Sequence, residues 1–212
     1  MNKILRSLRS LDRSTRLSQR LLPLLLLGIV LVPVSAQAHF EGSHSLGFFH
    51  GLAHPISGVD HLAAMVAVGL WATQLGRRAF WAVPLTFVAV MILGGLMGTT
   101  GFTIPFIEQG IAYSVLMLGA LITAAICLPL SQSAGIVALF ALYHGYAHGA
   151  EMPASASGLS YGLGFVVTTA LLHLSGIGLG LVCQQVFQRH ARLAQLFMGG
   201  LVTSVGVYLC VA

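Results

Sequence analysis

The segment HGLAHPISGVDHLAAMVAVGLWA (residues 50–72) places three histidines and an aspartate at the head of an apolar run. Pro55 has no backbone N–H and crowds the preceding helical turn, so a helix through this segment is expected to kink or unwind between Pro55 and Gly58. The segment therefore predicts a membrane helix with polar groups built into a distortion near its start.

The polar side chains of this segment fall close together on a helix. At 100° per residue, His50, His54 and His61 lie within about 40° of one another, and Asp60 lies about 80° to the side of His50. A kink would swing Asp60 toward the imidazoles. Ionisable groups cost about 2.5–3.5 kcal/mol each in the middle of a membrane helix, so their presence indicates function.

The whole chain has the composition of a membrane protein. Of its 212 residues 57% are hydrophobic and 7% are charged, whereas a soluble domain has roughly 25% charged residues. Apolar segments that reach the roughly 20 residues of a span lie at 45–73, 79–98, 109–130, 133–152, 158–183 and 192–211. We therefore expect an all-α integral membrane protein, a bundle of six transmembrane helices.

The N-terminal region has the pattern of a secretory signal peptide. Six of the ten basic residues precede residue 21, the apolar stretch LLPLLLLGIVLVPV covers 21–34, and the small residues of SAQA end at Ala38. Residues 1–38 are predicted to be cleaved, leaving one transmembrane domain at 39–212. Its four basic and four acidic residues balance, so no nucleic-acid partner is expected.

Basic residues set the expected orientation. Those of the mature chain lie in the loops at 77–78 and 189–192, whereas the loops near 99–108 and 153–158 contain no Lys or Arg. Basic loops stay in the cytoplasm. The mature N-terminus is therefore expected in the periplasm, and the protein in the bacterial inner membrane with lipid as its surroundings.

Tryptophan, glycine and cysteine residues lead to three further structural expectations. Trp71 and Trp81 flank the loop at 77–78, where an interfacial aromatic belt is expected. Glycine runs such as GGLMG (94–98) should allow close approach of helices. No CxxC pair occurs, so buried free thiols are expected at Cys127, Cys183 and Cys210.

A second polar cluster, YHGYAHGAEMP (residues 143–153), places His144, His148 and Glu151 on one helical face. The pattern HGxAH occurs at the start of the first span and at the end of the fourth. Because those spans run in opposite directions, both copies should reach the periplasmic side and could meet in one site. A 3+3 inverted repeat is not favoured, because it would place the shared motif on opposite sides.

Clustered imidazoles and carboxylates suit borderline divalent metals such as nickel, cobalt or zinc. The sequence therefore predicts an intramembrane metal site formed by His50, His54, Asp60, His61, His144, His148 and Glu151. His39, the first mature residue, could add its α-amine and imidazole as a chelate at the outer mouth. His173 and His190 lie apart from the clusters and are expected only to hydrogen-bond a neighbouring helix.

These motifs resemble a known family. HPISGVDHLAAMVAVGLWA (residues 54–72) resembles the HPxxGxDHxxAMxxVGxWA signature of the HupE/UreJ family at every fixed position. YHGYAHGAEMP is similar to that family's second block, FHGxAHGxEMP, with Tyr143 in place of Phe. The HPxxGxDH portion also resembles the histidine-aspartate-histidine motif of the wider nickel/cobalt permease superfamily.

The resemblance implies a secondary transporter, not an enzyme, that takes up nickel or cobalt as its substrate and has no prosthetic group. It also implies a link to nickel enzymes such as hydrogenase and urease. Carried over by position, the metal-handling residues are His54, Asp60, His61, His144, His148 and Glu151.

We expect the metal to pass through two stages. Imidazoles at the outer mouth come first, at His39, His50, His144 and His148. A central site follows, formed by His54, Asp60, His61 and Glu151. Glu108, at the outer end of the third span, could act as an acidic entry residue, but a solvated loop carboxylate is favoured, so it is left out of the site.

Two other functions use similar residues. A membrane zinc hydrolase would need histidines that hold zinc and a carboxylate that activates water. A b-type haem protein would use histidine pairs from two helices as axial ligands, and the Pro55 kink and the neighbouring acids argue against it.

Overall fold

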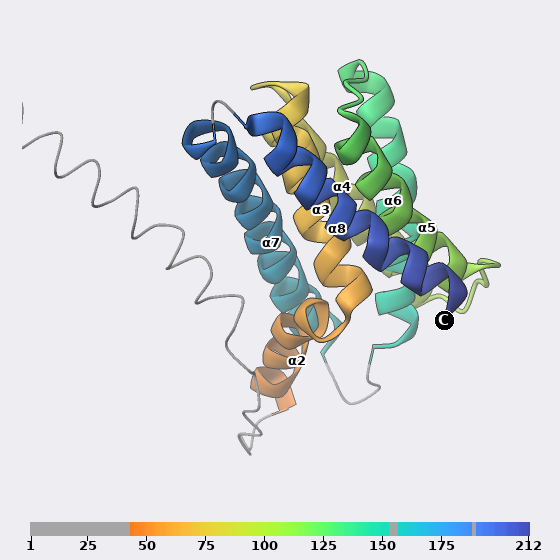
Figure 1. Cartoon of the computed structure of the whole chain (residues 1–212). Helices are drawn as coiled ribbons and strands as arrows, with labels where there is room; N and C mark the ends of the chain where they lie inside the picture. Colours follow the sequence, from red (N-terminus) through yellow and green to blue (C-terminus); the bar gives the residue numbers. More distant parts are fainter. Residues whose placement is uncertain (1–42, 153–156, 188–189) are drawn as a thin grey trace, which may run out of the picture. The chain divides into compact units, whose positions relative to one another are not determined.

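A computed structural model describes residues 43–152, 157–187 and 190–212. The predicted signal peptide and His39 lie outside the described residues. Every regular element in the described ranges is an α-helix (Figure 1). The helices are α2 (Ser43–Ser57), α3 (Val59–Leu75), α4 (Ala79–Gly98), α5 (Ile107–Ala124), α6 (Leu130–Ala150), α7 (Gly158–Val186) and α8 (Ala191–Val211).

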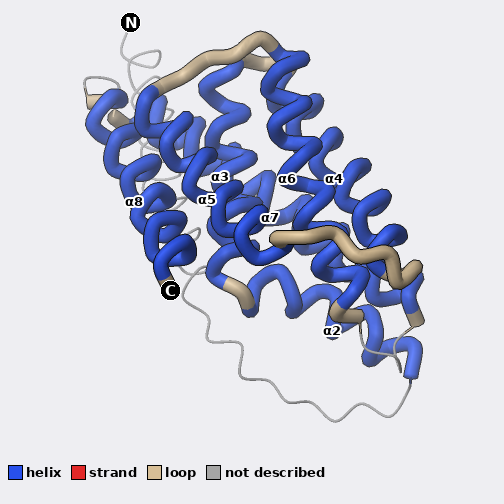
Figure 2. The backbone as a smooth tube through the Cα atoms, turned by 90° about the vertical axis from the view of Figure 1, so that its right-hand side faces the viewer, coloured by secondary structure: helices blue, strands red, loops and turns tan. Residues whose placement is uncertain are grey.

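The first predicted span is broken into two helices. α2 and α3 meet at Gly58 with a bend of 80°, where Pro55 and Gly58 predicted a distortion. Figure 2 shows α2 lying across one end of the bundle, whereas α3 runs along it with the other helices. The predicted distortion is confirmed, and the predicted span at 45–73 is a bent pair of helices.

The number of candidate spans is smaller than predicted. α4, α5, α7 and α8 are long and apolar enough to cross a membrane, and the bent pair α2–α3 makes a fifth if it counts as one span. α6 has the length of a span, 21 residues, but Ser and Gln at its start and two histidines near its end lower its mean hydropathy. The described residues thus form an all-helical membrane protein with four or five candidate spans.

Glycines bring helices together in pairs. α4 packs along α6, α5 along α8, and α7 along both α2 and α3. A Cβ on Gly94 would overlap the carbonyl of Leu142, and one on Gly145 would overlap the carbonyl of Met91. The packing role predicted for glycine is confirmed, because these helices touch backbone to backbone.

α3 lies at the centre of the bundle, in contact with every other described helix. Its Trp71 is fully buried and donates a hydrogen bond from Nε1 to the Ile126 carbonyl, 3.1 Å away. The interfacial position predicted for Trp71 is therefore wrong, because the central helix has no lipid-facing side there. Trp81 on the peripheral helix α4 is 68% exposed.

The cysteine prediction is partly wrong. All three thiols are free, as expected, but Cys127 and Cys210 are exposed and Cys183 is intermediate. Cys183 on α7 and Cys210 on α8 lie on outward-facing parts of their helices, where apolar sequence indicates contact with lipid rather than burial in protein. Cys127 lies in the loop between α5 and α6, and its thiol donates to the Gln74 carbonyl.

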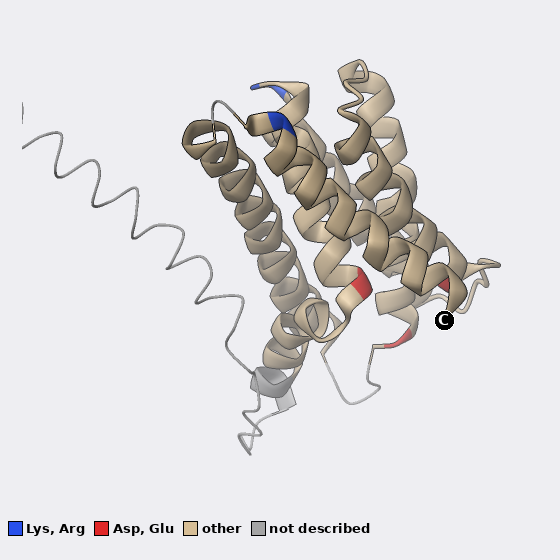
Figure 3. Ribbon diagram, in the orientation of Figure 1, with Lys and Arg blue, Asp and Glu red and all other residues tan. Residues whose placement is uncertain are grey.

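Charged residues separate to opposite ends of the bundle. Figure 3 shows the described basic residues at one end and the described acids at the other. The basic end holds Arg77, Arg78 and Arg192, and the acidic end holds Asp60, Glu108 and Glu151. The site predicted from the sequence therefore lies at the end where the described residues include no Lys or Arg.

Candidate metal centre

The break at Gly58 creates the first half of the site. Gly58 precedes α3 in an extended conformation, and a Cβ added there would lie 2.5 Å from Asp60 Oδ1 and 3.1 Å from His61 Nδ1. Only glycine therefore lets the aspartate and histidine fold back against the chain at the start of α3. This explains the spacing GxDH at residues 58–61.

Asp60 orients the ring of His61. Its Oδ1 accepts a hydrogen bond from the backbone N–H of His61 at 2.8 Å and a second from Nδ1 of the same residue at 2.7 Å. With the proton on Nδ1, the lone pair of the imidazole is on Nε2, which is buried and has no partner in the described structure. A carboxylate behind a histidine is the usual arrangement that prepares an imidazole to bind metal.

α6 contributes two buried imidazoles. His144 is fully buried, and its Nδ1 donates to the carbonyl of Phe140, one turn earlier, at 2.9 Å. The carbonyl can only accept, so Nε2 of His144 carries a lone pair, and it too lacks a partner among the described residues. His148, one turn later, is 3% exposed, and neither of its ring nitrogens has a hydrogen-bond partner there.

His54 and Glu151 complete the site at its mouth. Nε2 of His54 lies 3.5 Å from Glu151 Oε2, and their side chains are 32% and 54% exposed. Together with His148 they offer three ligand atoms within 4.8 Å of one another. The group therefore spans a half-exposed mouth and a buried interior.

The four imidazoles form a continuous cluster. The ring centroid of His148 lies 4.6 Å from that of His54 and 4.2 Å from that of His61, and His61 lies 5.0 Å from His144. Both HGxAH motifs thus contribute to one site, as the opposite directions of their helices predicted. Phe165 of α7 closes the side, 4.1 Å from His148.

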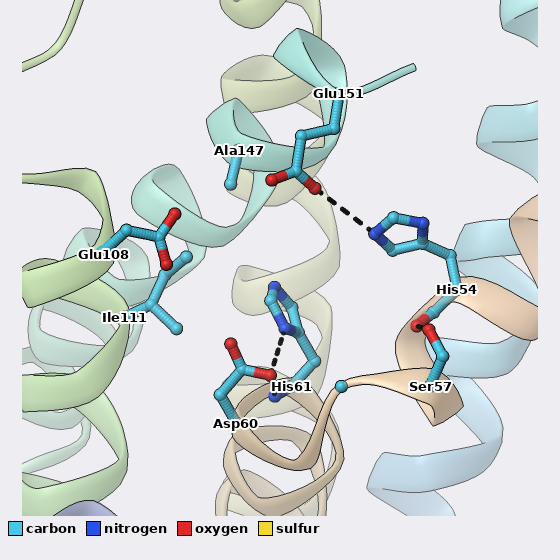
Figure 4. Close-up of a pocket in the computed structure, with 9 residues that line it drawn as sticks. His54, Ser57, Asp60, His61, Glu108, Ile111, Ala147 and Glu151 are labelled. Carbon is cyan, nitrogen blue, oxygen red and sulfur yellow. Dashed lines mark hydrogen bonds and ion pairs between the residues drawn. The ribbon is translucent and has the colours of Figure 1, made fainter. Parts of the chain in front are cut away.

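A cavity of about 230 Å³ opens beside this cluster, lined by His54, Asp60, His61, Glu108 and Glu151 among others. In Figure 4 the carboxylates of Asp60, Glu108 and Glu151 and the imidazole of His54 surround it, from α3, α5, α6 and α2. The arrangement can attract a cation by charge, through carboxylates, and bind it inside by nitrogen ligands.

The structure brings together six of the eight predicted site residues. These are His54, Asp60, His61, His144, His148 and Glu151. His50 is exposed on α2 and lies outside the cavity lining, because the 80° break removes it from the face it would share with His61 on a straight helix. His39 lies outside the described residues.

The structure reverses the predicted depth of several site residues. The sequence analysis placed His144 and His148 at the outer mouth and His54 and Glu151 at the centre. His144 and His148 are the most buried ligands, whereas Glu151 and His54 are at the mouth. The direction of α6 explains the reversal, since its last residue lies at the open end and each earlier turn lies deeper.

Glu108 is the residue that the sequence reasoning considered as an acidic entry residue but left out of the site. It is exposed in the first turn of α5 and lines the cavity opposite His54. One sequence signal could have placed it in the site. Glu108 stands at the start of a predicted span, on the same side of the membrane as both HGxAH motifs.

Comparisons with known proteins were made for the whole chain. A family profile described as HupE / UreJ protein matches residues 26–209. Protein HupE of Rhizobium leguminosarum bv. viciae is 40% identical over 185 residues, which cover 87% of this chain and 95% of that relative. No solved structure matches.

Proposed function

The chain belongs to the HupE/UreJ family, and from that premise we propose that it is a permease for divalent nickel or cobalt. The observation that carries the proposal is a cluster of four imidazoles from α2, α3 and α6 beside a cavity that two of them, His54 and His61, line together with three carboxylates. Imidazole favours borderline metals, whereas magnesium and calcium favour sites made of oxygen ligands.

Entry uses the carboxylates of the mouth. Glu151 and Glu108 are exposed on opposite sides of the cavity, and their charges raise the local concentration of cations. A hydrated ion there exchanges water for His54 and Glu151, whose ligand atoms are already close to those of His148.

The interior is a relay of nitrogen ligands. From His54 and His148 the cation moves to His61 and then to His144, since each imidazole contacts the next. Asp60 holds the proton of His61 on Nδ1 and supplies negative charge beside a doubly charged ion in a medium of low dielectric constant.

Membrane placement follows from charge and length. We place the basic end of the bundle in the cytoplasm and the acidic end in the periplasm of a bacterial inner membrane, after cleavage of residues 1–38. α6 then serves as a further span, giving six, with its polar residues turned into the site. Uptake in this direction would supply nickel enzymes such as hydrogenase or urease.

The two rival functions receive no support. Neither the family nor the relative indicates hydrolysis. The rings of His54 and His148 contact each other at 4.6 Å, which leaves no room between them for the plane of a haem bound to both.

The test is uptake of radiolabelled nickel and cobalt in cells that lack their own nickel permeases. Wild type is compared with His54→Ala and Asp60→Asn at matched membrane levels, with His190→Ala as the control, because His190 is exposed and distant from the acidic end. We expect both site variants to lose uptake at submicromolar metal in excess magnesium, and the control to keep it. Wild type that is well inserted but takes up neither metal would refute the proposal.

A further inference from the structure

His173 is a buried imidazole without a hydrogen bond. It lies near the middle of α7, is 1% exposed, and neither ring nitrogen has a partner within the described residues. The sequence predicted a hydrogen bond to a neighbouring helix, and that prediction is wrong. A neutral imidazole has both an N–H and a lone pair, and burying both unpaired is costly in water and more so in a membrane.

The described residues around His173 do not provide a hydrogen-bond partner for its ring nitrogens. The ring of Phe87 is 5.0 Å away, centroid to centroid. Thr169, one turn earlier on α7, donates its hydroxyl hydrogen to the sulfur of Met91, 3.7 Å away. The hydroxyl that could have served His173 is therefore directed elsewhere.

The same phenylalanine touches the deepest histidine of the metal centre. Phe87 is fully buried, and its ring lies 5.7 Å from that of His144. Nε2 of His144 has a lone pair and no partner in the described part of the chain. Two buried imidazoles with free nitrogen atoms in the described part of the chain thus contact the same aromatic ring.

We propose that His144 and His173 form a second, inner binding position for the divalent cation, next to the ring of Phe87, which both imidazoles contact. This rests on the proposed function and extends it. An ion released by His61 binds His144, and movement of the Phe87 ring lets it reach His173, further along the membrane. Both ligands are imidazoles, so the transfer exchanges one nitrogen ligand for another of the same kind.

The inner position also selects between metals. The described acids all lie at the open end of the bundle (Figure 3), so the inner position offers imidazole nitrogens and, among the described residues, no carboxylate. Magnesium and calcium, which need oxygen ligands, have little to bind there. Borderline metals keep their preferred ligand.

The test combines uptake with equilibrium binding. Cobalt binding to purified protein is followed by its visible absorbance, and nickel uptake is measured in cells at matched membrane levels. The variants are His173→Ala, His173→Phe, which keeps an aromatic ring of similar volume, and His173→Cys, which restores a metal ligand, with His190→Ala as the control. We expect His173→Ala and His173→Phe to lower nickel uptake at least about tenfold relative to wild type, and His173→Cys to recover part of that uptake. In all three variants, cobalt binding at the mouth should stay within about twofold of the wild-type affinity.

Three outcomes would overturn the inner position. Full uptake by His173→Phe would mean that the histidine only fills space. Joint loss of uptake and of cobalt binding at the mouth would mean that it only supports the outer ligands. Uptake that needs His54 but not His173 would refute the inner position while the permease stands, whereas wild type without uptake would refute both.

Discussion

α4 and α6 pack along each other through their glycines and differ by one residue in length, yet only α4 qualifies as a membrane span by composition. α4 turns leucines outward, with Leu85 62% and Leu93 59% exposed. α6 also turns a leucine outward, Leu139 at 54%, but buries His144 and His148 on its other side. The mean hydropathy of a helix averages over both of its faces. Polar residues on an inner, site-forming face can therefore lower the mean below that of a typical span even when the outer face is apolar.

Breaking the contact between these two helices is expected to have the most general effect, because it lowers the amount of folded protein. A Cβ on Gly145 would overlap the Met91 carbonyl, whereas Gly135 on the same helix has open space around it. We expect Gly145→Val to reduce the amount of monodisperse protein recovered in detergent about tenfold or more, because backbone cannot yield as a side chain can. Gly135→Val is the matched control. Equal recovery of the two variants would contradict the packing described.

The next effect separates the two faces of α6. His148→Ala removes a buried imidazole that contacts two others, while Leu139→Ala removes an outward-facing side chain of the same helix. We expect His148→Ala to weaken cobalt binding by more than about 100-fold, since even an outer partner of a ligand is worth about 10–100-fold. Leu139→Ala should bind as wild type does. Similar losses in both would place the polar face of α6 outside the site.

The smallest effect concerns the rim of the cavity. Glu108→Gln keeps the shape of the side chain and removes a charge that lies at the mouth. We expect nickel uptake at low metal to fall about two- to fivefold at low ionic strength and the difference to shrink as salt rises, because an exposed charge is screened. If Glu108→Gln lowered nickel uptake by a factor as large as the loss of cobalt binding expected for His148→Ala, and salt did not change that factor, Glu108 would be a direct ligand.

Much of the site could be predicted because its pieces are local. The distortion between Pro55 and Gly58 follows from backbone chemistry, and the meeting of the two HGxAH motifs follows from the opposite directions of their helices. The pairing of Asp60 with His61 is also local, since one carboxylate oxygen reaches both donors of the next residue.

The rest depended on geometry that the sequence does not carry. The size of the bend moved His50 away, and a helical wheel cannot give that angle. The burial of Trp71 depends on α3 being central, and the relation of His173 to His144 depends on Phe87 of a third helix. Glu108 lines the cavity because α5 packs against α3, a contact that the sequence pattern does not give.

The broken span also changes which helix ends face the cation. His54 lies in the last turn of α2 and His148 in the last turn of α6, and Glu151 caps α6. The backbone dipoles of a helix leave its C-terminal end partly negative and its N-terminal end partly positive. The mouth therefore collects two negative ends, while the positive ends at the starts of α3 and α5 carry Asp60 and Glu108 in their first turns. An unbroken helix through Gly58 would offer no helix terminus there, so in the proposed permease this break would give the backbone itself a share in attracting the metal.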